Sequence, residues 1–202
     1  TTSTGRLIAV SDYRHNLDDI GRDKFYTGTL RIDLVARTSD DNGKTWSEKM
    51  TIAAGDNTKE GSYLRAFGDA AIAAVGQNII VMAAAGDQLY PYATTASPNR
   101  MARIFSSDNG KTWSKEEITT KMYNSETSLI PQGVAAFFGS GKLVVDADFN
   151  GTGKSRIYGA LLVRTCIEGT YNNYNNYVVY SDDLGENWAI LGGSTNPIAS
   201  GD

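Results

Sequence analysis

Three observations on this 202-residue sequence predict an all-β fold built from repeated units. The apolar segments are short, rich in Val, Ile, Ala and Tyr, and separated by turn residues, which is typical of strands. Glycine supplies 21 of the 202 residues, above its usual share of ~7%. All three tryptophans close copies of one eight-residue pattern, so the fold is expected to repeat with that pattern.

The repeated pattern places serine, aspartate, glycine and tryptophan at fixed spacing. Its copies, here called box 1, box 2 and box 3, cover residues 39–46, 106–113 and 181–188. In each box the aspartate can accept hydrogen bonds from backbone N–H groups ahead of it, and the glycine two positions later supplies a positive φ. We therefore expect each box to be a hairpin turn whose tryptophan folds back as an apolar plug.

Strands are predicted before and after every box. The box aspartates Asp41, Asp108 and Asp183 follow one another at 67 and 75 residues, which leaves room for a four-stranded sheet with loops. The expected strands are 7–11, 31–38 and 50–53 in unit one, 70–75, 79–84, 101–105 and 117–119 in unit two, and 143–147, 156–164, 177–180 and 188–191 in unit three. The first strand of unit one is expected before Thr1.

Repeated four-stranded units without helices predict a β-propeller. Such rings usually need at least four blades, and this chain offers just under three, so we expect it to be part of a larger ring. A sandwich of about eleven strands is the alternative, although it gives no reason for the box to recur.

Composition argues against several classes of function. The formal net charge is −4 and the chain has no basic run, which argues against a nucleic-acid partner. Cys166 is the single cysteine and belongs to no Cys/His cluster, so neither a disulfide nor a metal site is expected. The longest apolar stretch, 70–86, is interrupted by Gly76, Gln77 and Asn78, so no membrane span is predicted.

The pattern Ser-x-Asp-x-Gly-x-Thr-Trp is the Asp box, and the sequence around it resembles the N-terminal half of the catalytic domain of bacterial sialidases (neuraminidases). The resemblance covers essentially the whole chain, 1–202. Besides the boxes it rests on residues 5–14, 18–21, 31–33, 67–72, 137–142 and 180–188.

The resemblance implies a six-bladed propeller and an exo-α-sialidase that removes terminal sialic acid from glycoconjugates with retention of configuration. In this family three arginines bind the substrate carboxylate, and the nucleophile is a tyrosine activated by a glutamate. A neutral phenol suits a carbon that bears a carboxylate, because an anionic nucleophile would be repelled. The resemblance further implies no cofactor, sialylated glycans as partners, and a secreted or periplasmic location.

Carried over residue by residue, the resemblance makes Asp19 the general acid/base, with Asp18 as the near alternative. Arg14 and Asp69 would bind the sugar near O4, although Ala70 follows Asp69 where many family members have proline. The first carboxylate-binding arginine is expected before Thr1, and the glutamate, the other two arginines and the tyrosine after Asp202. The 202 residues alone are therefore expected to be inactive.

A non-catalytic Asp-box propeller that binds glycan or protein is the alternative function, and a pure protein scaffold is a third. Without the resemblance, Arg14 and Asp19 would be an ordinary loop ion pair, and Asp69 could equally be a turn acceptor. His15 is expected to pack or to be solvated, because no nucleophile is paired with it. Tyr171, Tyr174 and Tyr177 are expected to form a polar loop entering a strand, and residues 151–155 a hairpin turn.

Overall fold

The computed structural model describes residues 1–15, 19–20, 31–59, 61–139, 141–193 and 197–200. Within these residues the chain forms thirteen strands and two short 3₁₀ helices, η2 (Tyr90–Tyr92) and η3 (Phe149–Gly151). The strands are β1 (Leu7–Arg14), β2 (Ile32–Ser39), β3 (Met50–Ala53), β4 (Phe67–Val75), β5 (Asn78–Ala85), β6 (Arg100–Ser106), β7 (Glu117–Thr119), β8 (Gly133–Phe138), β9 (Gly141–Lys142), β10 (Val144–Asp146), β11 (Arg156–Ile167), β12 (Thr170–Ser181) and β13 (Ala189–Leu191).

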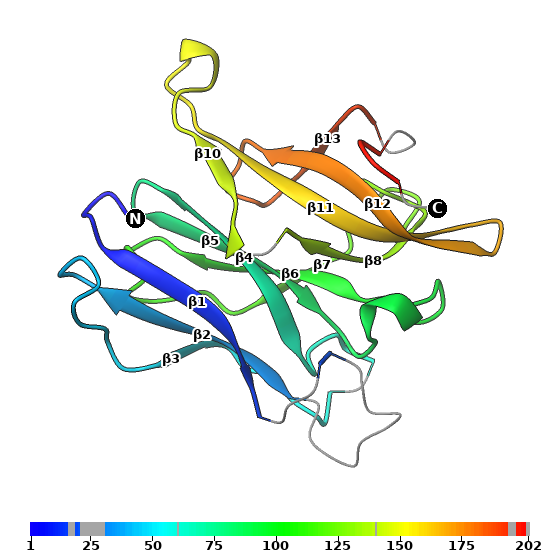
Figure 1. Ribbon diagram of the computed structural model, residues 1–202, viewed down its shortest axis with the longest axis horizontal. Coiled ribbons are helices and arrows are strands. Elements are labelled where there is room, and N and C mark those ends of the chain that lie inside the picture. Colours follow the sequence, from blue (N-terminus) through cyan, green and yellow to red (C-terminus); the bar gives the residue numbers. More distant parts are fainter. Residues whose placement is uncertain (16–18, 21–30, 60, 140, 194–196, 201–202) are drawn as a thin grey trace.

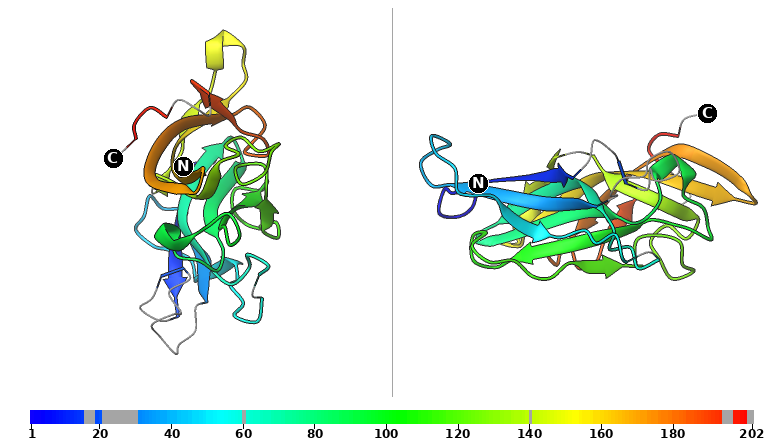
Figure 2. Two further views of the ribbon diagram at one scale, coloured as in Figure 1. Left: turned by 90° about the vertical axis from the view of Figure 1, so that its right-hand side faces the viewer. Right: turned by 90° about the horizontal axis from the view of Figure 1, so that it is seen from below.

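The strands form three separate sheets that follow one another along the chain (Figure 1). The first sheet has the order β1-β2-β3, and the second has the order β7-β6-β5-β4-β9. The third has the order β10-β11-β12-β13, and β8 also pairs with β11. In the left view of Figure 2 the first, second and third sheets follow one another from bottom to top. The prediction of repeated all-β units is confirmed, and the single sandwich is wrong.

The first strand of the third sheet differs from its prediction. The predicted strand 143–147 is the short β10 in the structure, and a strand that the sequence analysis missed, β8, pairs with the other part of β11. Between these two strands β9 leaves the third sheet and pairs in parallel with β4 of the second. The Leu143 N–H then donates to the Ile72 carbonyl at 2.9 Å. This first strand is therefore interrupted because part of it joins the neighbouring sheet.

The boxes are turns closed by one repeated set of hydrogen bonds. In box 2 the Ser106 hydroxyl donates to Asp108 at 2.8 Å and accepts from the Gly110 N–H at 2.9 Å. Asp108 also accepts from the Thr112 N–H at 2.9 Å and the Thr112 hydroxyl at 2.6 Å. Boxes 1 and 3 repeat the arrangement, with an asparagine in place of the threonine in box 3. The predicted hairpin turns are confirmed.

Each of the last two boxes packs against the preceding sheet through its glycine. A Cβ added at Gly110 of box 2 would lie 2.6 Å from Cδ1 of Ile8 in β1. A Cβ added at Gly185 of box 3 would lie 3.0 Å from Cγ2 of Ile80 in β5. Both glycines have positive φ, 77° and 82°, so side chains are disfavoured there by contact and by backbone conformation. The glycine thus closes the turn and allows neighbouring sheets to pack closely.

Apolar residues fill the two spaces between the sheets. Leu34 and Ala36 of the first sheet pack with Val81 and Ile104 of the second in one buried cluster. A larger cluster joins the second and third sheets. Its buried members include Ile80, Met82, Met101, Phe138, Leu161, Val163, Tyr177 and Val179. Burial of these side chains is the main favourable contribution to holding the sheets together.

The box tryptophans do not share one environment. Trp113 and Trp188 are half-buried against these inter-sheet clusters, and the Trp188 ring lies 5.0 Å from that of Phe138. Trp46 of box 1 is 41% exposed, on a face of the first sheet with Tyr13 and Lys49. In all three boxes the tryptophan folds back over the glycine of its own turn, as expected. The ring of Trp46 is more exposed than the other two because no described sheet covers that face.

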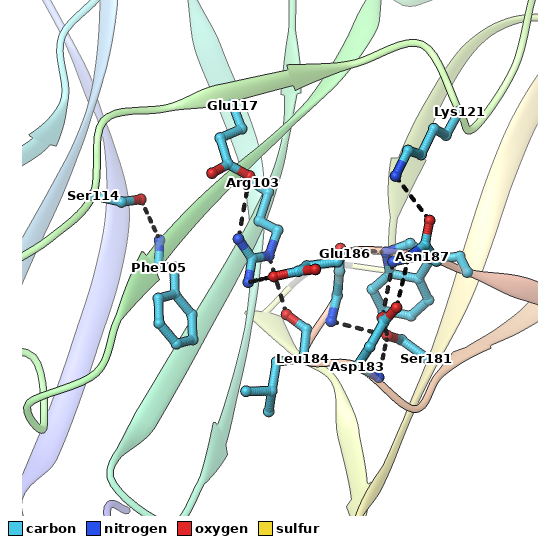
Figure 3. Close-up of polar contacts among 12 residues, drawn as sticks. Arg103, Phe105, Ser114, Glu117, Lys121, Ser181, Asp183, Leu184, Glu186 and Asn187 are labelled. Atoms are coloured by element: carbon cyan, nitrogen blue, oxygen red, sulfur yellow. Dashed lines mark hydrogen bonds and ion pairs between the residues drawn. The ribbon is translucent and has the colours of Figure 1, made fainter.

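A buried arginine ties the second sheet to box 3 (Figure 3). Nε of Arg103 in β6 donates to the Leu184 carbonyl of box 3 at 3.1 Å. Its guanidinium also pairs with Glu117 at 3.2 Å and Glu186 at 3.7 Å, while the arginine side chain is 8% exposed. Lys121 adds a hydrogen bond to Asn187 at 2.8 Å. Polar contacts thus supplement the apolar contact between these sheets.

Two smaller expectations concern the third sheet. Residues 151–155 lie in the turn that joins β10 to the antiparallel β11, as predicted. Tyr177 lies in a strand, as predicted for residues 177–180, but β12 already begins at Thr170, so the assignment of Tyr171 and Tyr174 to a loop was wrong. Tyr177 is buried in the core, whereas Tyr174 is exposed. No helix in the described part of the chain is long and apolar enough to span a membrane.

The box aspartates predict a specific dependence of stability on pH. Hydrogen bonds, first those from the threonine hydroxyls, lower the pKa of Asp41 and of Asp108 to about 2. Because these pKa values lie below that of an unfolded aspartate, the contribution is present above about pH 4 and is lost as pH falls toward 2. We expect Asp108→Asn to lower Tm by about 2–4 °C at pH 6.

That difference should shrink below about pH 3, because protonation of Asp108 then removes the same contribution from the wild type. Calorimetry across pH measures it, with exposed Glu126→Gln as the control. A deficit that stays constant down to pH 2 would contradict the assignment.

Replacing Arg103 tests the polar contact between the second sheet and box 3. Arg103→Met keeps the length of the side chain but removes its donors to Leu184, Glu117 and Glu186. We expect the free energy of unfolding to fall by about 1–3 kcal/mol, because the bond from the buried guanidinium to the Leu184 carbonyl is lost. Urea unfolding measures this, with exposed Lys115→Met as the control. Equal stability of the two variants would show that the polar contact contributes nothing.

Candidate active site

The predicted site residues lie at the ends of the sheets opposite the boxes. Box 1 begins at Ser39, which pairs with Leu7 at the start of β1, and box 2 begins at Ser106, which pairs with Ile79 of β5. Arg14 is at the other end of β1, and Asp69 is near the start of β4, whose end leads to β5 on the box side. In this fold the candidate site and the boxes therefore lie at opposite ends of the sheets.

A β-bulge sets the orientation of Asp69. In the pairing of β4 with β5, Gly68 faces Ala84 and Ala71 faces Met82, so the two residues between them on β4 oppose one residue of β5. Asp69 adopts a φ of 52°, which non-glycine residues rarely do. A bulge of this kind turns a side chain out of its regular direction along the strand. The half-buried carboxylate of Asp69 is placed in this way.

Arg14 lies between two carboxylates. Its Nη2 donates to Oδ2 of Asp12 at 3.2 Å and lies 3.4 Å from Oδ1 of Asp19. Asp12 and Arg14 are two positions apart in β1, so their side chains lie on the same face of the strand. The side chains of Asp12, Arg14 and Asp19 are 21%, 38% and 44% exposed. The group therefore combines ordered charge contacts with access to solvent.

Asp69 is electrostatically part of this group. Its pKa is raised above the ordinary value, first because burial disfavours the carboxylate and then because Asp12 and Asp19 are nearby. Arg14 lowers the pKa of Asp69. The structure thus brings together all three residues that the sequence analysis selected, Arg14, Asp19 and Asp69. The alternative acid/base, Asp18, lies outside the described residues.

Both ends of the connection that carries Asp19 are bonded to one buried carboxylate. Asp33 of β2 accepts from Nε2 of His15 at 2.9 Å and from Nε of Arg31 at 2.8 Å, and the Gly55 N–H donates to it at 2.8 Å. Burial raises the pKa of Asp33, but these bonds outweigh it and leave the pKa lowered. His15 therefore has a structural partner in Asp33, which the sequence analysis did not foresee.

The arrangement is suited to recognising a hydroxyl group and transferring a proton. A guanidinium donates hydrogen bonds and a carboxylate accepts them, whereas a sugar hydroxyl does both. Arg14 and Asp69 could therefore contact one hydroxyl from two sides. Asp19, with its exposed carboxyl group, could exchange a proton with a substrate.

Sequence reasoning missed Asp12 and Asp33 as members of this region. Asp12 lies two residues before Arg14, but the predicted strand ended at residue 11, whereas β1 continues to Arg14 and places both side chains on one face. For Asp33, the pair with Arg31 was readable, because the two residues lie two positions apart in the predicted strand 31–38. Its contacts with His15 and Gly55 had no such signal, because they depend on the pairing of β1 with β2 and on the approach of Gly55.

Comparisons with known proteins agree with the repeats and the fold. The family model described as BNR/Asp-box repeat matches residues 37–48 and 104–115, which contain boxes 1 and 2. The sialidase of Clostridium perfringens is 29% identical over 193 residues, covering 92% of this chain and 45% of that protein. The sialidase of Paraclostridium sordellii is 31% identical over 198 residues, covering 94% of this chain and 44% of that protein.

Solved sialidase structures share the fold. The Hadza microbial sialidase Hz136 matches with a TM-score of 0.71 and 21% identity, over 96% of this chain and 36% of that one. The leech intramolecular trans-sialidase matches with a TM-score of 0.66 and 14% identity, over 95% of this chain and 42% of that one. The chain thus spans less than half the length of the curated relatives it matches. Its three sheets are arranged as blades of a sialidase-type β-propeller, and the chain is similar to part of a bacterial sialidase domain with Asp-box repeats.

Proposed function

We propose that the protein containing this chain is a retaining exo-α-sialidase that hydrolyses terminal sialic acid from glycoconjugates, in a secreted or periplasmic setting. The observation that carries the proposal is the meeting of Arg14, Asp19 and Asp69 at the end of the sheets opposite the boxes. The two curated relatives, both sialidases, support it.

In this proposal Asp19 is the general acid/base. Protonated Asp19 gives its proton to the glycosidic oxygen as the bond to the leaving group breaks, and its carboxylate then takes a proton from the water that releases the sugar. Arg14 donates to a sugar hydroxyl, and Asp69 accepts from the same region. Burial of Asp69 strengthens such a bond, because little water competes for the carboxylate.

The remaining groups of the reaction are assigned to the rest of the protein. The proposal places the arginines that bind the sialic acid carboxylate, the nucleophilic tyrosine and its activating glutamate in blades beyond this chain. The same blades would cover the face of the first sheet that carries Tyr13 and Trp46, which are each 41% exposed. They would likewise cover the free side of the third sheet, where Val144 and Leu191 are exposed.

Asp19→Ala in the complete protein tests the acid/base assignment. Hydrolysis of a fluorogenic sialoside should slow by about 10²- to 10⁴-fold in kcat, the usual contribution of a positioned acid/base. Asp40→Ala is the matched control, because Asp40 also pairs with an arginine of the first sheet, Arg6 at 2.6 Å, but lies at the box end. Wild-type binding of sialylated glycan without turnover would favour the non-catalytic propeller.

The isolated 202-residue chain should not hydrolyse sialosides. Without the carboxylate-binding arginines and the nucleophile, Arg14, Asp19 and Asp69 can contact a sugar but cannot form the covalent intermediate of a retaining mechanism. A coupled fluorescence assay at high protein concentration measures this, with the complete protein as the positive control. Turnover by the isolated chain would show that the active site does not need groups from the rest of the protein.

A further inference from the structure

The position of Asp12 in β1 does not by itself determine what its carboxylate contacts. Its carboxylate points along the face of β1 toward Arg14 and accepts from Nη2 at 3.2 Å. The same Nη2 lies 3.4 Å from Asp19. An arginine Nη carries two hydrogens, so one nitrogen can serve Asp12 and Asp19 together. Asp12 thereby holds the same guanidinium nitrogen that lies next to the proposed acid/base.

Gly68 of β4 provides the room for this arrangement. A Cβ added at Gly68 would lie 3.2 Å from Oδ2 of Asp12 and 3.2 Å from Cδ1 of Ile20. Gly68 has no positive φ, so its backbone conformation does not demand glycine. The absence of a side chain instead lets the Asp12 carboxylate lie directly against the backbone next to Asp69. Two strands of different sheets therefore meet at this carboxylate.

We propose that Asp12 is a positioning residue of the sialidase site, which holds the Arg14 guanidinium where it contacts both the sugar and Asp19. The inference rests on the proposed function, because it assigns to Asp12 a role in that same site. Asp12 acts through Arg14, so its contribution should depend on Arg14 being present.

The surrounding charges are consistent with this role. Three charged groups of this region change the pKa of Asp69. Asp12 of β1 and Asp19, which follows β1, raise it, and Arg14 of β1 lowers it. With all three carboxylates ionised, this cluster carries more negative than positive charge. Loss of Asp12 would remove one of the carboxylates that hold the Arg14 guanidinium.

A double-mutant cycle in the complete protein tests the proposal. Asp12→Asn and Asp12→Ala should each lower kcat/KM for a fluorogenic sialoside by about 10- to 100-fold, mainly through KM, because Arg14 binds the sugar before and during the reaction. In an Arg14→Ala background, Asp12→Ala should have less than about a 3-fold further effect. Asp40→Ala, which removes the Arg6 pair of the same sheet, is the control and should leave both constants unchanged.

Crystal structures separate this proposal from the proposed function. In the wild type the guanidinium of Arg14 should have one orientation facing Asp19, and in Asp12→Ala it should turn away. Gly68→Ala should displace the Asp12 carboxylate and so reproduce the effect if Asp12→Ala fails to fold. The role of Asp12 would be overturned if the Arg14 guanidinium kept its orientation in Asp12→Ala. It would also be overturned if the loss of kcat/KM in the double mutant equalled the product of the two single losses. Absence of turnover by the wild type would instead contradict the sialidase function and leave the structural test decisive for Asp12.

Discussion

The hydrogen bonds from the box aspartate to its own turn are the constraint on which the fold depends. In each box one carboxylate satisfies donors that would otherwise be exposed at the turn, and one serine hydroxyl joins the carboxylate to the glycine N–H. The glycine can then adopt positive φ and lie against the preceding sheet, as Gly110 does on Ile8. A local turn motif thereby sets the distance between two sheets.

This constraint gives the two ends of the sheets different chemistry. At the box end, hydrogen bonds from threonine lower the pKa of Asp108 to about 2, and the carboxylate is permanently charged near neutrality. At the opposite end, burial and the neighbouring acids raise the pKa of Asp69. The same type of side chain is thus used for structure where donors surround it, and is available for a substrate where few protein donors reach it.

Much of the fold was predictable because its signals are local. The boxes and the strands beside them follow from spacing and turn chemistry. In the first two sheets the predicted strands are present, but β1 extends three residues further, to Arg14, β4 begins three residues earlier, at Phe67, and β9 was not predicted. β8 was missed because its pairing with β11 is interrupted by β9, which joins another sheet. Tyr171 and Tyr174 were assigned to a loop because an asparagine pair follows each of them, but the pairing of β12 with β11 keeps them in a strand.

The candidate site was less accessible to sequence reasoning. Arg14, Asp19 and Asp69 were selected through the family resemblance, because nothing in their spacing brings residue 69 next to residue 14. The bulge that turns Asp69 exists only in the pairing of β4 with β5, and the approach of Asp12 to Gly68 exists only once β1 and β4 have packed. His15 and Arg31 likewise meet only through Asp33. Contacts between sheets are long-range, so their consequences appear only in the structure.

The location of a bound sialic acid in crystals of the complete protein is the most direct test of this account. The account predicts electron density for the sugar at the ends of β1 and β4, with one of its hydroxyl groups in contact with Arg14 and Asp69. Density for the sugar at the box end of the sheets would contradict this prediction. So would density at the ends of β1 and β4 that lies out of reach of Arg14 and Asp69.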